Sequence, residues 1–124
     1  MYLTIPEIER FTAAISALTG PGSTLAGDVQ NTTALTSPFS EPFRRAWFRL
    51  GHPMVSGIDD PETFFATFGF TRAHVVEQSL YAKQFQYANP KMLAVLAKYP
   101  RRTHPTAIER SFFFTVHKPV TSPL

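Results

Sequence analysis

The chain has 124 residues, a formal net charge of +3 and no cysteine. This length fits one domain, and a composition with 44% hydrophobic residues can build a packed core. The missing cysteines exclude disulfides and thiolate metal sites. No apolar run approaches the roughly 18 residues of a membrane span, and the amphipathic start is not a signal peptide. We therefore expect a single cytoplasmic domain over residues 1–124, with no membrane partner.

The first predicted element is a helix that starts after Thr4 and ends at Gly20. Thr4 and Glu7 have the spacing of a capping box, which satisfies two free backbone N–H groups at a helix start. Apolar residues recur through this segment at helical spacing, namely Ile5, Ile8, Phe11, Ile15 and Leu18. A strand over residues 23–29 follows. Because an α/β domain normally opens with a strand, we expect this chain to begin in mid-fold.

The rest of the chain alternates predicted helices and strands. Helices are expected to begin after Ser40, after Asp60, at Leu80 and after Asn89. Strands are expected over residues 70–79 and 111–117. The tail, residues 118–124, is expected to fray.

The last predicted strand contains three consecutive phenylalanines, Phe112, Phe113 and Phe114. A strand with one wet face alternates apolar and polar residues, and this one does not. We therefore expect both of its faces to be covered and the strand to lie in the interior of the sheet.

Two polar residues stand near the end of the first strand, where open α/β sheets place their ligand-binding loops. Asp28 is the candidate catalytic residue, because a carboxylate there can orient a substrate or act as a base. The other interpretation is a loop carboxylate that helps to cap the following turn. Asn31, in the loop of residues 30–39, is a candidate substrate-binding residue.

The second helix carries three arginines, Arg44, Arg45 and Arg49. A guanidinium pairs bidentately with a carboxylate, so Arg44 and Arg45 are candidate substrate-binding residues. The alternative is the solvated face of an amphipathic helix. The four histidines lack the spacing of metal ligands, and we expect no metal site.

Several short motifs occur in a definite order along the chain. They are Met1-Tyr2-Leu3, Gly20-Pro21-Gly22-Ser23, Leu25-Ala26-Gly27-Asp28, Ser56-Gly57-Ile58-Asp59-Asp60-Pro61-Glu62 and Phe68-Gly69-Phe70. This series resembles the C-terminal half of class I S-adenosylmethionine-dependent methyltransferases, in the leucine carboxyl methyltransferase-like group that includes many O-methyltransferases. In that family the first motif ends the fourth strand, the second is a turn, and the third is the fifth strand. The last leads into the sixth strand.

The resemblance implies an α/β fold, the C-terminal half of a Rossmann-like methyltransferase sheet with helices on both faces. The family's seventh strand is antiparallel and lies between strands five and six. The three strands here would then be ordered residues 23–29, 111–117 and 70–79. This order places the phenylalanine strand in the centre, as the burial argument also requires.

The resemblance also implies transfer of a methyl group from S-adenosyl-L-methionine to an oxygen of a small molecule or to a carboxylate. Tyr2, which follows the end of strand four, is the implied cofactor-binding residue; the alternative is an N-terminal residue with no fixed place. The family binds its cofactor mainly through a Gly-rich loop, and the chain contains no Gly-x-Gly-x-x-Gly. We expect a truncated or split form that alone binds the cofactor weakly and is completed by an N-terminal half.

Two other functions remain open at this stage. The chain would be a nonenzymatic interaction module if it pairs, for example as a homodimer, through the unpartnered edge of the strand over residues 23–29. Binding of nucleic acid is disfavoured, because the net charge is small and no nucleic-acid-binding motif is present. The basic residues it would use are Arg44, Arg45, Arg49, Arg101 and Arg102.

Overall fold

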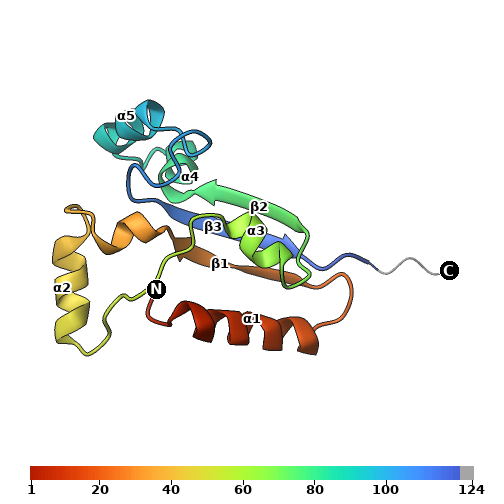
Figure 1. The fold of residues 1–124 in the computed structure, drawn as a ribbon. Helices are drawn as coiled ribbons and strands as arrows, with labels where there is room; N and C mark the ends of the chain where they lie inside the picture. The colour runs from red at the N-terminus through yellow and green to blue at the C-terminus, as the bar shows by residue number, and fades with distance from the viewer. Residues whose placement is uncertain (121–124) are drawn as a thin grey trace.

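The computed structural model describes residues 1–120 and builds them into a three-stranded sheet with helices around it (Figure 1). The strands are β1 (Thr24–Gln30), β2 (Arg72–Glu77) and β3 (Ser111–His117). The helices are α1 (Ile5–Leu18), α2 (Glu41–Arg49), α3 (Pro61–Ala66), α4 (Gln78–Gln84) and α5 (Pro90–Lys98), with a 3₁₀ turn, η1 (Thr32–Leu35). Part of the tail expected to fray, residues 121–124, lies outside the described residues.

The sheet has the order β1-β3-β2, and β3 is antiparallel to both neighbours. Phe114 of β3 faces Gly27 of β1 on one side and Val75 of β2 on the other. The predicted strand order and the direction of the last strand are confirmed, as is the α/β class.

One face of the sheet carries the core. Phe112, Phe114 and Val116 are buried on it, and the ring centroids of Phe114 and Phe65 are 4.4 Å apart. Apolar side chains of α1, of α3 and of the turn after α3 pack against this cluster, namely Ile5, Ile8, Ile15, Phe64 and Phe68. Burial of a side chain of this size contributes about 1.5–3 kcal/mol, so this face holds much of the fold's stability.

The other face is largely bare, and the expectation that both faces of β3 are covered was wrong. Phe113 points to this face and is 43% exposed. Its neighbour there is Tyr81 of α4, at 5.4 Å between ring centroids. Helices α1 and α3 both pack on the core face. On the second face, α4 contacts β2 and β3. The expected helices on both faces are therefore only partly present.

The helix starts follow the sequence signals. The capping box of α1 is confirmed: Glu7 N donates to Thr4 Oγ1 at 3.3 Å, and Thr4 N donates to Glu7 Oε1 at 3.0 Å. Asp60 caps α3 and Asn89 caps α5 through their side chains. None of the helices within residues 1–120 is both long and apolar enough to cross a membrane.

Helix α1 shows which of its apolar residues the core uses. Ile5, Ile8 and Ile15 are partly buried around a buried Thr12. Phe11 and Leu18, which share the helical spacing, are 59% and 86% exposed. The periodicity therefore predicted the helix, and the packing selected a narrower stripe from it.

Candidate functional site

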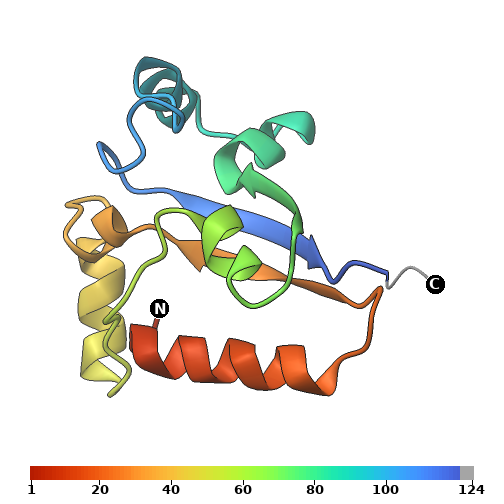
Figure 2. The same cartoon turned by 45° about the vertical axis from the view of Figure 1, so that its right-hand side comes forward.

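The candidate site lies at the edge of the sheet where β1 and β2 end and β3 begins. Figures 1 and 2 show η1, α2 and α5 grouped beyond this edge. The chain segments that meet there come from Gln30 at the end of β1, Glu77 at the end of β2 and Ser111 at the start of β3. In α/β sheets the carboxyl ends of the strands are where ligands bind.

Asn31 is fully buried at this edge and holds the segment before β3 in place. Its Nδ2 donates to the carbonyls of Pro105 and Ile108, at 3.1 and 2.9 Å, and its Oδ1 accepts from Arg110 N at 2.8 Å. Both amide hydrogens are thereby used. The predicted contact of Asn31 with a substrate stays a prediction, and it would have to use the remaining lone pair of Oδ1.

Next to Asn31 lies a buried ion pair between Arg110 and Glu77. Arg110 Nη1 donates to Glu77 Oε1, and Arg110 Nη2 donates to the carbonyls of Tyr99 and His104, the latter at 2.9 Å. The Arg110 Nε–H has no hydrogen-bond partner among the described residues. A buried donor without a partner is uncommon in folded proteins, and this atom has almost no exposed surface.

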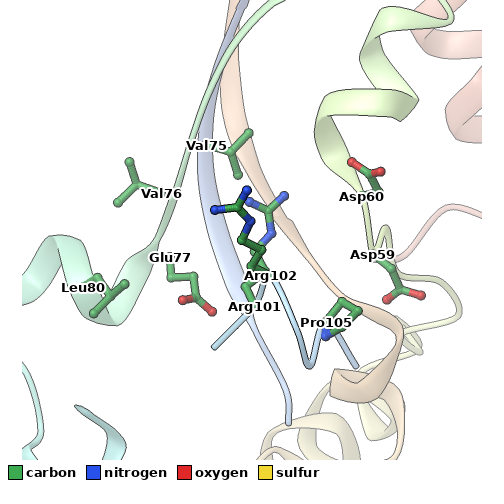
Figure 3. A pocket seen from close by; sticks show the side chains of 9 residues that line it. All are labelled: Asp59, Asp60, Val75, Val76, Glu77, Leu80, Arg101, Arg102 and Pro105. Atoms are coloured by element: carbon green, nitrogen blue, oxygen red, sulfur yellow. The ribbon is translucent and has the colours of Figure 1, made fainter. Parts of the chain in front are cut away.

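A cleft of about 770 Å³ opens beside this pair (Figure 3). It is lined by Asp59, Asp60, Val75, Val76, Glu77, Leu80, Arg101, Arg102 and Pro105. In Figure 3 the two acidic residues before α3 lie on one side, Glu77 and Leu80 lie on the other, and the two arginines lie between them.

Most charges of this cleft already have partners. Asp59 accepts from Thr32 N at 2.8 Å, and Arg101 pairs with Glu62 and lies over the Phe112 ring at 4.9 Å. Among the cleft residues of the described chain, Arg102 is the charged side chain with neither an ion pair nor a hydrogen bond.

Asp60 is the cleft residue whose acidity is altered. The Thr63 hydroxyl, and then the Thr63 backbone N–H, hold the pKa of Asp60 below its ordinary value. A general base is most effective when its pKa lies near the working pH. Asp60 therefore serves as a helix cap rather than as a general base.

The predicted site residues are not gathered around that cleft. Tyr2 is 48% exposed and packs against the aromatic side of α2, with its ring 5.6 Å from Trp47 and 6.4 Å from His52. Asp28 is exposed inside β1, two residues before the strand ends, on the face that carries Phe113. Its side chain makes no hydrogen bond within residues 1–120.

The arginines of α2 are largely committed to their own neighbourhood. Arg44 donates through Nη1 to the carbonyls of Ala34 and Ser37, at 2.7 and 2.8 Å, and to Ser40 Oγ at 2.6 Å. Arg45 is exposed and pairs with Glu41 at 2.6 Å. Arg44 thus holds the loop that follows β1, and Arg45 lies on a solvated face.

Sequence reasoning missed the Arg110–Glu77 pair. The available signal was Glu77 near the end of one predicted strand and the opposite charge of Arg110 just before the predicted strand over residues 111–117. Within residues 1–120 no three His, Asp or Glu side chains come together as a metal ion would require. No protein-family model, curated protein or solved structure matches this chain.

Proposed function

We propose that this chain is the C-terminal, acceptor-side part of an S-adenosylmethionine-dependent O-methyltransferase. The observation that carries the proposal is the order β1-β3-β2, with the last strand in the chain inserted antiparallel between the other two. This is the arrangement of strands five, seven and six in the family that the motifs resemble. The Rossmann-like identity of the sheet is part of the proposal.

The position of the first residues supports the same assignment. Met1 O accepts from Val55 N at 2.8 Å, and three residues later in that segment Ile58 N donates to Gln30 O at 2.7 Å. The start of the chain is therefore tied, through residues 55–58, to the carboxyl end of β1. A chain leaving a fourth strand parallel to β1 would emerge at this edge.

The residues present fit one wall of a cofactor site. Tyr2 is half exposed at this edge, with its ring supported by Trp47, but no Gly-rich loop occurs in the sequence. The cofactor would supply an electrophilic methyl group, and the protein's task would be to orient the acceptor oxygen. Asp28 lies on the same face of β1 as Gln30, and two residues along a strand span about 7 Å. Asp28 is the proposed base that takes the proton of an acceptor bound over this face.

The test uses the longest reading frame that contains residues 1–124. Its product is assayed for binding of S-adenosylmethionine by titration calorimetry and for transfer of a tritiated methyl group. We expect both, with little binding by the 124-residue chain alone. The Asp28→Asn variant should lower kcat by about 10²–10⁴-fold and leave cofactor affinity unchanged. A full-length product that fails to bind the cofactor at millimolar concentration contradicts the proposal.

A second candidate function, pairing through the sheet edge, is favoured by the register of β1. The backbone groups of Thr24, Ala26 and Asp28 point away from β3, since Asn31 N and Ser23 O bond to β3 and its flanks. Sedimentation should then detect a dimer. Ala26→Pro removes one outward N–H and spares the ladder to β3, so it should yield a monomer. A wild-type chain that stays monomeric at high concentration refutes this function.

A further inference from the structure

A groove separate from the Figure 3 cleft runs between the loop after β1, helix α5 and the segment before β3. It consists of two hollows of about 450 and 370 Å³, which adjoin because Phe39, Met92 and Glu109 line both. Each hollow lies within the size range of small-molecule sites. The inner hollow reaches Gln30 and Ser111, so the groove opens at the ligand-binding edge of the sheet.

The walls of the groove are apolar and its inner end is polar. Phe39, Met92 and Val95 line the outer hollow. The inner hollow is lined by Phe43 and Leu96 and also by hydroxyl, amide, carboxylate and guanidinium groups. A ligand with an apolar body and one polar end fits this distribution.

The polar end contains the unpartnered donor described above. Arg110 lines the inner hollow, its side chain is fully buried, and its Nε–H has no partner within the described residues. The guanidinium makes three other hydrogen bonds, one to Glu77 and two to backbone carbonyls. Nε itself has almost no exposed surface, so a ligand oxygen that satisfies this donor must displace part of the lining of the inner hollow.

The charges of the groove indicate an uncharged ligand. Lys91 and Arg110 carry two positive charges, and Glu77 and Glu109 carry two negative charges. Arg44, on the adjoining helix α2, already donates through Nη1 to three oxygens. Lys91 has no ion pair among the described residues, but Glu109 lines the same hollow and is unpaired as well. An anionic ligand would therefore leave water for a groove with no net positive charge, which is unfavourable in a partly buried site.

We propose that this groove binds an uncharged aromatic molecule whose hydroxyl or carbonyl oxygen accepts a hydrogen bond from Arg110 Nε. That this groove holds the methyl acceptor rests on the proposed function, whereas the binding of such a molecule in the groove does not depend on it.

The test is an NMR titration of the ¹⁵N-labelled chain at pH 7 with three matched probes: neutral 2-naphthol, anionic 2-naphthoate and 2-methylnaphthalene, which has no oxygen. We expect 2-naphthol to shift the amides of residues 33–39, 89–95 and 107–111, and to bind at least tenfold more tightly than either other probe. Ala107→Trp, which fills the outer hollow, should abolish these shifts. Ala94→Trp, on the same helix as Met92 but outside the groove, is the matched control and should leave them unchanged.

Three results would overturn the proposal: no binding of 2-naphthol, either other probe binding as tightly as 2-naphthol, or 2-naphthol binding that survives Ala107→Trp. Because the titration contains no cofactor, it separates the two hypotheses. If 2-naphthol binds as expected but the full reading frame transfers no methyl group, the groove stands and the methyltransferase assignment fails. If methyl transfer occurs but 2-naphthol does not bind here, the groove assignment fails alone.

Discussion

Replacement of Asn31 by aspartate tests whether the edge of the sheet is held together as the structure indicates. The Asn31→Asp change keeps the shape of the side chain and the oxygen that accepts from Arg110 N at 2.8 Å. It removes the two N–H donors that bond to the carbonyls of Pro105 and Ile108. A carboxylate oxygen would then face those carbonyls in a fully buried position.

The expected loss of stability at pH 7 is roughly 4 kcal/mol. A buried acceptor left without its donor costs about 1–3 kcal/mol. The two carbonyls here are part-buried, and the charge of the buried carboxylate adds to the loss. The loss should depend on pH, because a protonated carboxyl can donate to one carbonyl again. The pKa of the introduced carboxyl is therefore raised in the folded state, so the destabilisation is smallest below the ordinary pKa of aspartate and grows as the pH rises through it.

The assay is urea unfolding followed by circular dichroism at pH 4 and pH 7, with wild type measured at each pH. The matched control is Asn89→Asp, at the exposed N-cap of α5, where either residue caps well and the change should be close to neutral. A loss at Asn31 below about 1 kcal/mol, or one that does not change with pH, would refute the proposed role of this side chain.

Four further substitutions test other parts of the fold. Gly57→Ala should destabilise the fold by several kcal/mol, roughly as much as a core defect does. The reason is that a Cβ there would lie 2.5 Å from backbone atoms of the segment after β1. Amide hydrogen exchange should become faster at that edge of the sheet. Asp60→Asn should cost about 0.5 kcal/mol at pH 7, a figure reduced for exposure. The Thr63 bonds lower the pKa of Asp60 in the folded state. The stability difference between wild type and variant should therefore be complete above the ordinary pKa of aspartate and should disappear as the pH falls through the folded-state pKa. Unfolding measured over a series of acidic pH values checks this. Phe112→Ala should cost about 3–5 kcal/mol and Phe113→Ala about 1 kcal/mol or less, and equal losses in urea unfolding would contradict the one-sided core.

Local signals in the sequence predicted the elements well. The capping box at Thr4 and the caps at Asp60 and Asn89 are each made by residues within a few positions of one another, and all three form as expected. The helix expected from Leu80 begins earlier, at Gln78, directly after β2. Such shifts arise because helix ends depend on the neighbouring strand as well as on their own residues.

The contacts that build the candidate site join residues far apart in the chain. Asn31 and Arg110 are 79 positions apart, and Arg110 and Glu77 are 33 apart. A single sequence gives no direct sign of such pairings. The same limit explains Phe113: three successive phenylalanines indicate a central strand, but which face receives helices depends on the paths of α1 and α3.

The structure changes the kind of acceptor that the chain suits. On sequence alone, Arg44 and Arg45 favoured a carboxylate, which needs no base to deprotonate it. In the fold, Arg44 donates through Nη1 to the carbonyls of its own loop and Arg45 pairs with Glu41, so both already have oxygen partners. Under the proposed function a neutral hydroxyl acceptor requires a base. Asp28 is an exposed carboxylate on the strand that ends at the groove, although it does not line the groove itself, and it is therefore the base that the Asp28→Asn variant tests.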